Sequence, residues 1–247
     1  MQKILGRVPV LAATLILAAA GFFLRLRHLN VGFDPQGLPN GRGVWPLVIL
    51  CVLSLAAFLL VSLKKEKRCG YEENFSPDML SVLLSVLAAG LLLAGNVMAF
   101  TRVSPMATPV NQMLTRVTAA LGAASGLSFV GIAAAQHKGE KPSAALHLLP
   151  VVYYILQMIF NFKSWSTDPI ILDYCFKLFA LIFVMLAVFH AGGFVFGTGQ
   201  RRSTVFLCLA GVFFSIISPA DGGASYVLIT SSSALWLTAN GWQIMKD

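Results

Sequence analysis

The sequence predicts an all-α, polytopic integral membrane helix bundle with about eight transmembrane helices. The chain is 57% hydrophobic and only 11% charged, and its mean hydropathy is +0.78. Its apolar stretches are continuous, and most approach the roughly 20 residues that a helix needs to cross a bilayer. Backbone groups in hydrocarbon must be bonded internally, and these runs lack the alternation of barrel strands, so helices are predicted. The eight predicted spans are 8–24, 44–63, 79–100, 112–136, 145–162, 169–197, 204–218 and 224–243.

The first span has two interpretations. The span begins with the basic residues Lys3 and Arg7, continues as an apolar run and contains alanines at 18–20, as a membrane helix can. The same pattern fits a cleavable signal peptide, and cleavage before Gly21 would leave seven spans. Because the apolar run continues past Gly21, an uncleaved first helix is preferred.

Local signals mark the second, third and sixth spans. The second follows a Gly/Pro-rich loop at 30–43, which is either a plain connector or a lid over a cavity. The third follows Ser76-Pro77-Asp78, which supplies a helix cap, a first-turn proline and an acid. Asp168-Pro169 supplies the same signals at the start of the sixth. Both sites therefore predict helix starts.

Small residues indicate which helices pack closely. The fourth span has a run of Ala, Gly and Ser at 119–126, the sixth carries Gly193 and Gly197 in GxxxG spacing, and the eighth has Thr and Ser at 230–233. In lipid, such surfaces allow close helix contact. The fourth, sixth and eighth spans are therefore predicted to be central, and the leucine-rich second and third to be peripheral.

The basic residues predict the orientation. Eleven of the 18 fall on the side of the two termini, and five fall in loops on the other side. Basic loops stay in the cytoplasm, so a multi-pass protein of the cell membrane with both termini cytoplasmic is predicted. This placement explains the net charge of +8 without a nucleic-acid partner. The basic loop 64–68 is predicted to contact anionic lipid headgroups. No loop is long enough for a separate domain, so residues 1–247 are predicted to form one transmembrane domain.

No cofactor, metal site or catalytic motif is predicted. The four cysteines show no CxxC spacing, and three of them lie within spans. The sequence contains no HExxH, no P-loop, no aspartate-rich motif and no haem-like histidine pair. An enzyme is therefore the less favoured class.

Polar residues in the outer half of the predicted spans define the candidate site. The substrate-binding set is Asp173, Lys177, Arg116, Asn96, Gln157 and Asn161. Ionisable residues within a membrane usually face the bundle interior or a wet cavity, because exposure to lipid costs several kcal/mol. Asp173 and Lys177 are four residues apart and can pair on one helix face, with Lys177 about 12 Å along its predicted helix. The sequence predicts an outward-facing polar pocket; the alternative is a self-neutralising pair and an arginine that reaches the headgroups.

A serine and a histidine form a second pattern. His190 begins an HxxGxxxG stretch in the sixth span, and Ser128 ends a GxS triplet in the fourth. Together they resemble the catalytic pair of the rhomboid intramembrane proteases, and the resemblance implies that His190 would activate Ser128. The HxxxN element and the Trp-Arg loop of that family are absent, and both residues fall in the inner half of their spans.

These observations favour a small-solute or ion transporter, or a membrane-embedded solute-binding subunit. A non-catalytic assembly or sensing subunit is the main alternative, and a rhomboid-like serine protease is a weaker one. The expected partners are the lipid bilayer and a small solute or ion, with other membrane subunits as a further option.

Overall fold

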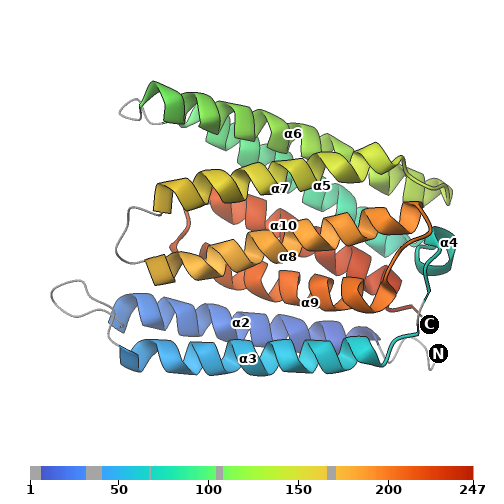
Figure 1. The fold of residues 1–247 in the computed structure, drawn as a ribbon, viewed down its shortest axis with the longest axis horizontal. Helices are drawn as coiled ribbons and strands as arrows, with labels where there is room; N and C mark the ends of the chain where they lie inside the picture. The colour runs from blue at the N-terminus through green and yellow to red at the C-terminus, as the bar shows by residue number, and fades with distance from the viewer. Residues whose placement is uncertain (1–6, 32–40, 67, 104–107, 166–170, 247) are drawn as a thin grey trace.

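The computed structural model describes residues 7–31, 41–66, 68–103, 108–165 and 171–246, with the backbone alone at 41–43, 164–165, 171–173 and 221. Eight long helices and two short turns account for nearly all of this part of the chain (Figure 1). The elements are α2 (Arg7–Val31), α3 (Gly41–Leu63), α4 (Tyr71–Asn74), α5 (Met79–Thr101), α6 (Pro109–Lys138), α7 (Ala144–Trp165), α8 (Ile171–Val195), α9 (Arg201–Ile217), η1 (Ser218–Asp221) and α10 (Ala224–Ile244). The predicted all-α membrane bundle is confirmed. Both the centre of the predicted lid loop, 32–40, and Asp168-Pro169 lie outside the described residues.

Seven of the long helices have the length and apolar composition of membrane spans. The eighth, α10, has 21 residues but carries more polar side chains than the others. These polar groups bond within the protein: Asn240 Nδ2 donates to the Trp236 carbonyl at 2.8 Å, and Ser232 Oγ donates to the Ala88 carbonyl of α5 at 2.6 Å. A helix enclosed by other helices can therefore tolerate a composition that lipid would penalise.

The long helices run back and forth along one direction. As Figure 1 shows, α2 begins and α10 ends at the same end of the bundle, which we call the terminal end. The end where α2 finishes and α3 starts is the opposite end. α2 is continuous through Gly21, whose missing side chain makes room for Ile217 of α9. The first predicted span is thus one uninterrupted helix that packs into the bundle.

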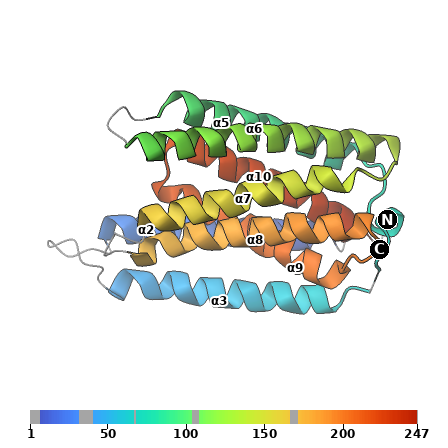
Figure 2. The ribbon, with the colours of Figure 1, turned by 45° about the horizontal axis from the view of Figure 1, so that its top comes forward.

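Six of the helices form a ring. In sequence order, each helix from α5 to α10 packs against the next, and α10 returns to pack against α5 (Figures 1 and 2). Aromatic side chains fill the interior, where Phe129 of α6 stacks on Trp236 of α10 at 4.8 Å between ring centroids. The α2–α3 hairpin packs on the outside of the ring against α9.

The burial of the spans partly corrects the sequence-based prediction. The second span, α3, is peripheral as predicted, with 22% of its residues buried, but the seventh, α9, is the most enclosed, with 72%. The third span was predicted to be peripheral, and this is wrong, because α5 packs extensively against α6 and α10. Leu80, Leu83 and Leu87 face outward, whereas Ala88, Ala89 and Leu92 are buried.

The start of α5 also differs from the predicted cap. The helix begins at Met79, after the proline, and the Asp78 side chain does not cap it. The Asp78 carboxylate instead accepts a hydrogen bond from Trp242 Nε1 of α10 at 2.7 Å, and Ser76 Oγ accepts one from Lys246 Nζ at 2.8 Å. These two residues therefore connect the start of α5 to the end of α10.

Candidate functional site

An aromatic and polar cluster lies between α5, α7, α8 and α10 in the half of the bundle nearer the opposite end. Asn96 of α5 is buried, with Nδ2 donating to the Leu92 carbonyl at 2.8 Å. Its Oδ1 accepts a hydrogen bond from the Tyr153 hydroxyl of α7 at 3.2 Å. The Asn96 amide lies directly over Gly122 of α6, where any side chain would collide with it. This glycine therefore makes room for the link between α5 and α7.

A second hydrogen bond joins α7 to α10. The hydroxyl of Tyr154 and Oγ of Ser233 are 2.8 Å apart, and both side chains are buried. Ser233 Oγ also donates to the Ile229 carbonyl of its own helix at 3.0 Å. Neighbouring tyrosines of α7 thus reach α5 and α10, which are adjacent helices of the ring.

Lys177 of α8 is the charged member of the cluster. Its Nζ lies 5.5 Å from the ring centroid of Tyr174, on the same helix, and 5.5 Å from that of Tyr226, on α10. Both contacts fall within the range of cation–π attraction. In the described part of α8, which begins at Ile171, Lys177 is six residues along the helix, or about 9 Å. The side chain is half-buried at this depth.

The rest of the predicted set lies in different environments. Gln157 and Asn161 are half-buried on α7, at the i+4 and i+8 positions from Tyr153, so the three share a helix face. Arg116 is exposed on α6 and lies outside the cluster. Asp173 is in the first turn of α8, but its side chain lies outside the described residues.

The sequence analysis missed the tyrosines and Ser233. Tyr153, Gln157 and Asn161 recur every fourth residue, and Tyr226, Thr230 and Ser233 follow a similar helical spacing on α10. This periodicity of polar side chains in otherwise apolar spans was the available signal.

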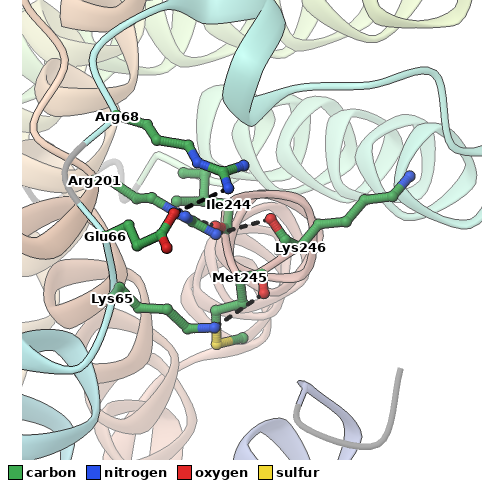
Figure 3. A network of polar contacts seen from close by, with 7 residues as sticks. All are labelled: Lys65, Glu66, Arg68, Arg201, Ile244, Met245 and Lys246. Carbon is green, nitrogen blue, oxygen red and sulfur yellow. Dashed lines mark hydrogen bonds and ion pairs between the residues drawn. The ribbon is translucent and has the colours of Figure 1, made fainter. Parts of the chain in front are cut away.

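A second polar network is at the terminal end, where cationic side chains bond the last carbonyls of α10 (Figure 3). Arg201 of α9 is buried, with Nε donating to the Ile244 carbonyl and Nη2 to the Lys246 carbonyl, both at 2.8 Å. Lys65 Nζ donates to the Met245 carbonyl at 3.1 Å. The last carbonyls of a helix have no partner within it and carry partial negative charge, so these cations stabilise the end of α10.

Ser128 and His190, which resemble the rhomboid pair, are not brought together. Ser128 Oγ donates to the Ala124 carbonyl of its own helix at 3.3 Å. His190 lines a cavity between α7 and α8, and α7 packs between α6 and α8. Among the described residues, no hydrogen bond links the two side chains.

The outer surface defines the class of protein. Large apolar side chains point outward all along the long helices: Ile16 and Phe23 are 69% exposed, and Leu60 is 62% exposed. A soluble protein would not leave such surface in water, whereas a bilayer covers it. The chain is a multi-pass α-helical membrane protein. No protein family, no curated protein and no solved structure matches it.

Proposed function

We propose that the chain is a small-solute or ion transporter, or the membrane-embedded solute-binding subunit of one. It resides in the cell membrane with both termini in the cytoplasm, as its basic residues favour. The terminal end then faces the cytoplasm, and the cluster around Lys177 faces outward.

The position of Lys177 carries this proposal. An ammonium group about 9 Å along a membrane helix is costly in lipid, and such residues mark solute or ion sites in membrane proteins. Two tyrosine rings flank the Lys177 ammonium, and its side chain is only half-buried. A polar solute that reached it would meet a cation, aromatic faces and hydroxyl groups together.

The other predicted residues take different roles. Gln157 and Asn161 are half-buried on the Tyr153 face of α7 and offer amide groups between Tyr153 and the opposite end. Asp173 is four residues before Lys177 on α8, and we propose it as the counter-ion. Asn96 positions Tyr153, and Arg116, being exposed, attracts anions to the outer surface.

The proposal is tested with the purified full chain in liposomes on a solid-supported membrane. A panel of amino acids, carboxylates, inorganic anions and monovalent cations is applied, and the transport current is recorded. We expect a current for at least one class and at least a tenfold loss in Lys177→Met. Lys163→Met, which removes an exposed lysine near the same end of the bundle, is the matched control and should retain the current.

Two results would contradict this proposal, the first by excluding transport and the second by excluding Lys177 as its site. One is the absence of current for every solute with the wild-type protein. The other is a Lys177→Met current equal to that of Lys163→Met while both variants show wild-type thermal unfolding. Loss of folding in Asp173→Asn and in Lys177→Met, with recovery in the double variant, would instead assign the pair to helix packing.

A second candidate is a non-catalytic assembly or sensing subunit. The observation that favours it is the complete burial of Asn96, Tyr153 and Tyr154, whose polar groups bond to other helices or to their own. Such bonds also serve simply to hold helices together. This candidate predicts that the chain co-purifies with another membrane protein from its native membrane and that Lys177→Met leaves the complex intact.

A further inference from the structure

Two adjoining cavities at the terminal end differ sharply in character. The first, of about 520 Å³, lies between α7 and α8 and is mainly apolar, with Leu148, Val151, Phe189 and Phe196 in its wall. The second, of about 400 Å³, lies at the start of α9 and is lined by Arg68, Arg201 and Arg202 together with Cys69, Gly199, Gln200 and Ser203. Gln200 lines both cavities, so the two spaces are neighbours.

The basic cavity has the chemistry of an anion site. Three arginines line it, and no acidic side chain is in its wall among the described residues. Arg201 is buried and bonds the carbonyls of Ile244 and Lys246. The half-buried Arg68 pairs with the exposed Glu66 at 3.1 Å, and the half-buried Arg202 donates from Nε to the Lys65 carbonyl at 2.7 Å, so these two present their remaining guanidinium N–H groups to the cavity. The first turn of α9 borders the same space, and the Gln200 side chain does not cap it. Guanidinium groups and the N–H groups at a helix start both favour phosphate oxygens.

The apolar cavity contains a buried polar group. His147 of α7 is 4% exposed and lines the cavity. Its Nδ1 is buried and reaches no described group with hydrogen-bond geometry, although the Ser143 backbone is near enough to interact with it. The ring is held against α8, because its Cβ lies 3.0 Å from where a side chain on Gly192 would begin. His147 therefore places a polar imidazole ring in the wall of an otherwise mainly apolar cavity.

Polarity changes with depth across the two neighbouring cavities. The arginines are at the end of the bundle, in or next to the first turn of α9. His147 is in the first turn of α7, about 5 Å along the helix, and Val151 is about 10 Å along it. Phe189 and Leu148, which line the apolar part, are also about 60% exposed to the membrane side. From the end of the bundle inward, the cavities thus present cationic, then hydrogen-bonding, then apolar groups, which is the order of phosphate, ester and acyl chain in a phospholipid.

We propose that the two neighbouring cavities bind a bilayer phospholipid with an anionic headgroup. The phosphate occupies the basic cavity, His147 and Gln200 face the ester region, and an acyl chain lies between α7 and α8. This site is distinct from the cluster around Lys177, and the proposal does not depend on transport.

The test uses the purified full chain in detergent and native mass spectrometry. Phosphatidylglycerol and phosphatidylcholine of equal chain length are added at equal concentration, and the bound fraction of each is measured. We expect phosphatidylglycerol to be retained about tenfold better, since a charge-assisted contact is worth roughly that factor. Arg68→Gln should lose the preference, whereas Lys138→Gln, which removes an exposed charge at the same end, should keep it.

Ala145→Trp tests the acyl-chain part of the site. Ala145 is exposed and lines the apolar cavity, so a tryptophan there fills it without entering the helix core. We expect about a tenfold loss of phosphatidylglycerol retention with unchanged thermal unfolding. If Ala145→Trp retains as much phosphatidylglycerol as wild type, lipid binds only around the outside of the bundle and the proposal is overturned. Equal retention of the two lipids by the wild-type protein also overturns it.

The exposed Cys69 gives a second measurement on the wild-type protein. Because Cys69 lines the basic cavity and the other cysteines lie within spans, its reaction with a charged maleimide reports access to the site. Phosphatidylglycerol should slow this reaction about tenfold, and phosphatidylcholine or inorganic phosphate should not. Equal protection by inorganic phosphate alone would identify a free-anion site and contradict the lipid.

Discussion

Replacing Gly122 with alanine should destabilise the bundle, although alanine is the better helix former. Gly122 is in the middle of α6, where the Asn96 amide of α5 occupies the space that a Cβ would need. Moving that amide breaks its hydrogen bonds to the Leu92 carbonyl and to the Tyr153 hydroxyl. Overpacking costs roughly 1–3 kcal/mol, and the interhelical hydrogen bond from Tyr153 contributes about 0.6 kcal/mol. The better helix propensity of alanine offsets up to about 1 kcal/mol of this. We therefore expect a net loss of about 1–3 kcal/mol.

Gly90→Ala is the matched control for this prediction. Gly90 is an exposed glycine within α5, and a Cβ there meets no atom within 4 Å. The same substitution should therefore stabilise the helix by up to about 1 kcal/mol through propensity alone. The two variants, compared by thermal unfolding in one detergent, should shift Tm in opposite directions, with Gly122→Ala lower by about 5–10 °C.

A rescue variant separates steric conflict from other causes. Asn96→Ala removes the amide that Gly122→Ala would displace, so the double variant should be more stable than the additive sum of the two single changes. Wild-type stability in Gly122→Ala, or strict additivity in the double variant, would refute the reasoning about this contact.

Three further predictions concern other parts of the molecule. Arg201→Gln should lower stability by about 2–4 kcal/mol, because it removes charged hydrogen bonds to two carbonyls at the end of α10. The control Arg27→Gln, at an exposed position, should change stability by less than about 0.5 kcal/mol. Equal thermal unfolding of the two variants would contradict the capping role of Arg201. Ser232→Ala should cost about 1 kcal/mol, because it leaves the Ala88 carbonyl without its bond from α10, and an unchanged Tm would remove that bond from the account. Burial raises the pKa of Tyr71, which lies outside the spans, to about 12. As pH rises, the unfolded chain therefore loses this proton before the folded protein does. The contribution of Tyr71 to stability is intact below about pH 10 and should fall as pH rises through 12. Ultraviolet titration of wild type against Tyr71→Phe checks this, and a difference spectrum with a midpoint near 10 would contradict it.

The positions of the spans could be predicted because hydropathy reports directly on the lipid. A segment in hydrocarbon must be apolar and about 20 residues long, whatever its neighbours are. The first span illustrates the limit of this signal. Its hydropathy suggested an end at residue 24, whereas α2 continues to Val31 and buries Arg25 and His28. Those polar residues are accommodated by contacts within the protein, including the Phe176 ring 4.9 Å from the Arg25 guanidinium, and hydropathy does not report such contacts.

The candidate site was predicted less completely. Lys177 and Asn96 stand out because a charge or an amide is rare in a membrane helix. Tyr153 and Tyr154 do not, because tyrosine is common both in cores and at membrane interfaces. Arg116 was grouped with the others by depth alone, and α6 turns it to the outside of the bundle.

The sequence by itself determined that this is a membrane protein of about eight helices, since that follows from segment-by-segment transfer into lipid. The tertiary structure alone decided the ring of α5 to α10, the enclosure of α9 and α10, and the positions of the apolar and basic cavities that both border Gln200. These features depend on which helix faces meet. In lipid, packing and hydrogen bonds between helices choose those faces, because apolar attraction gives little preference.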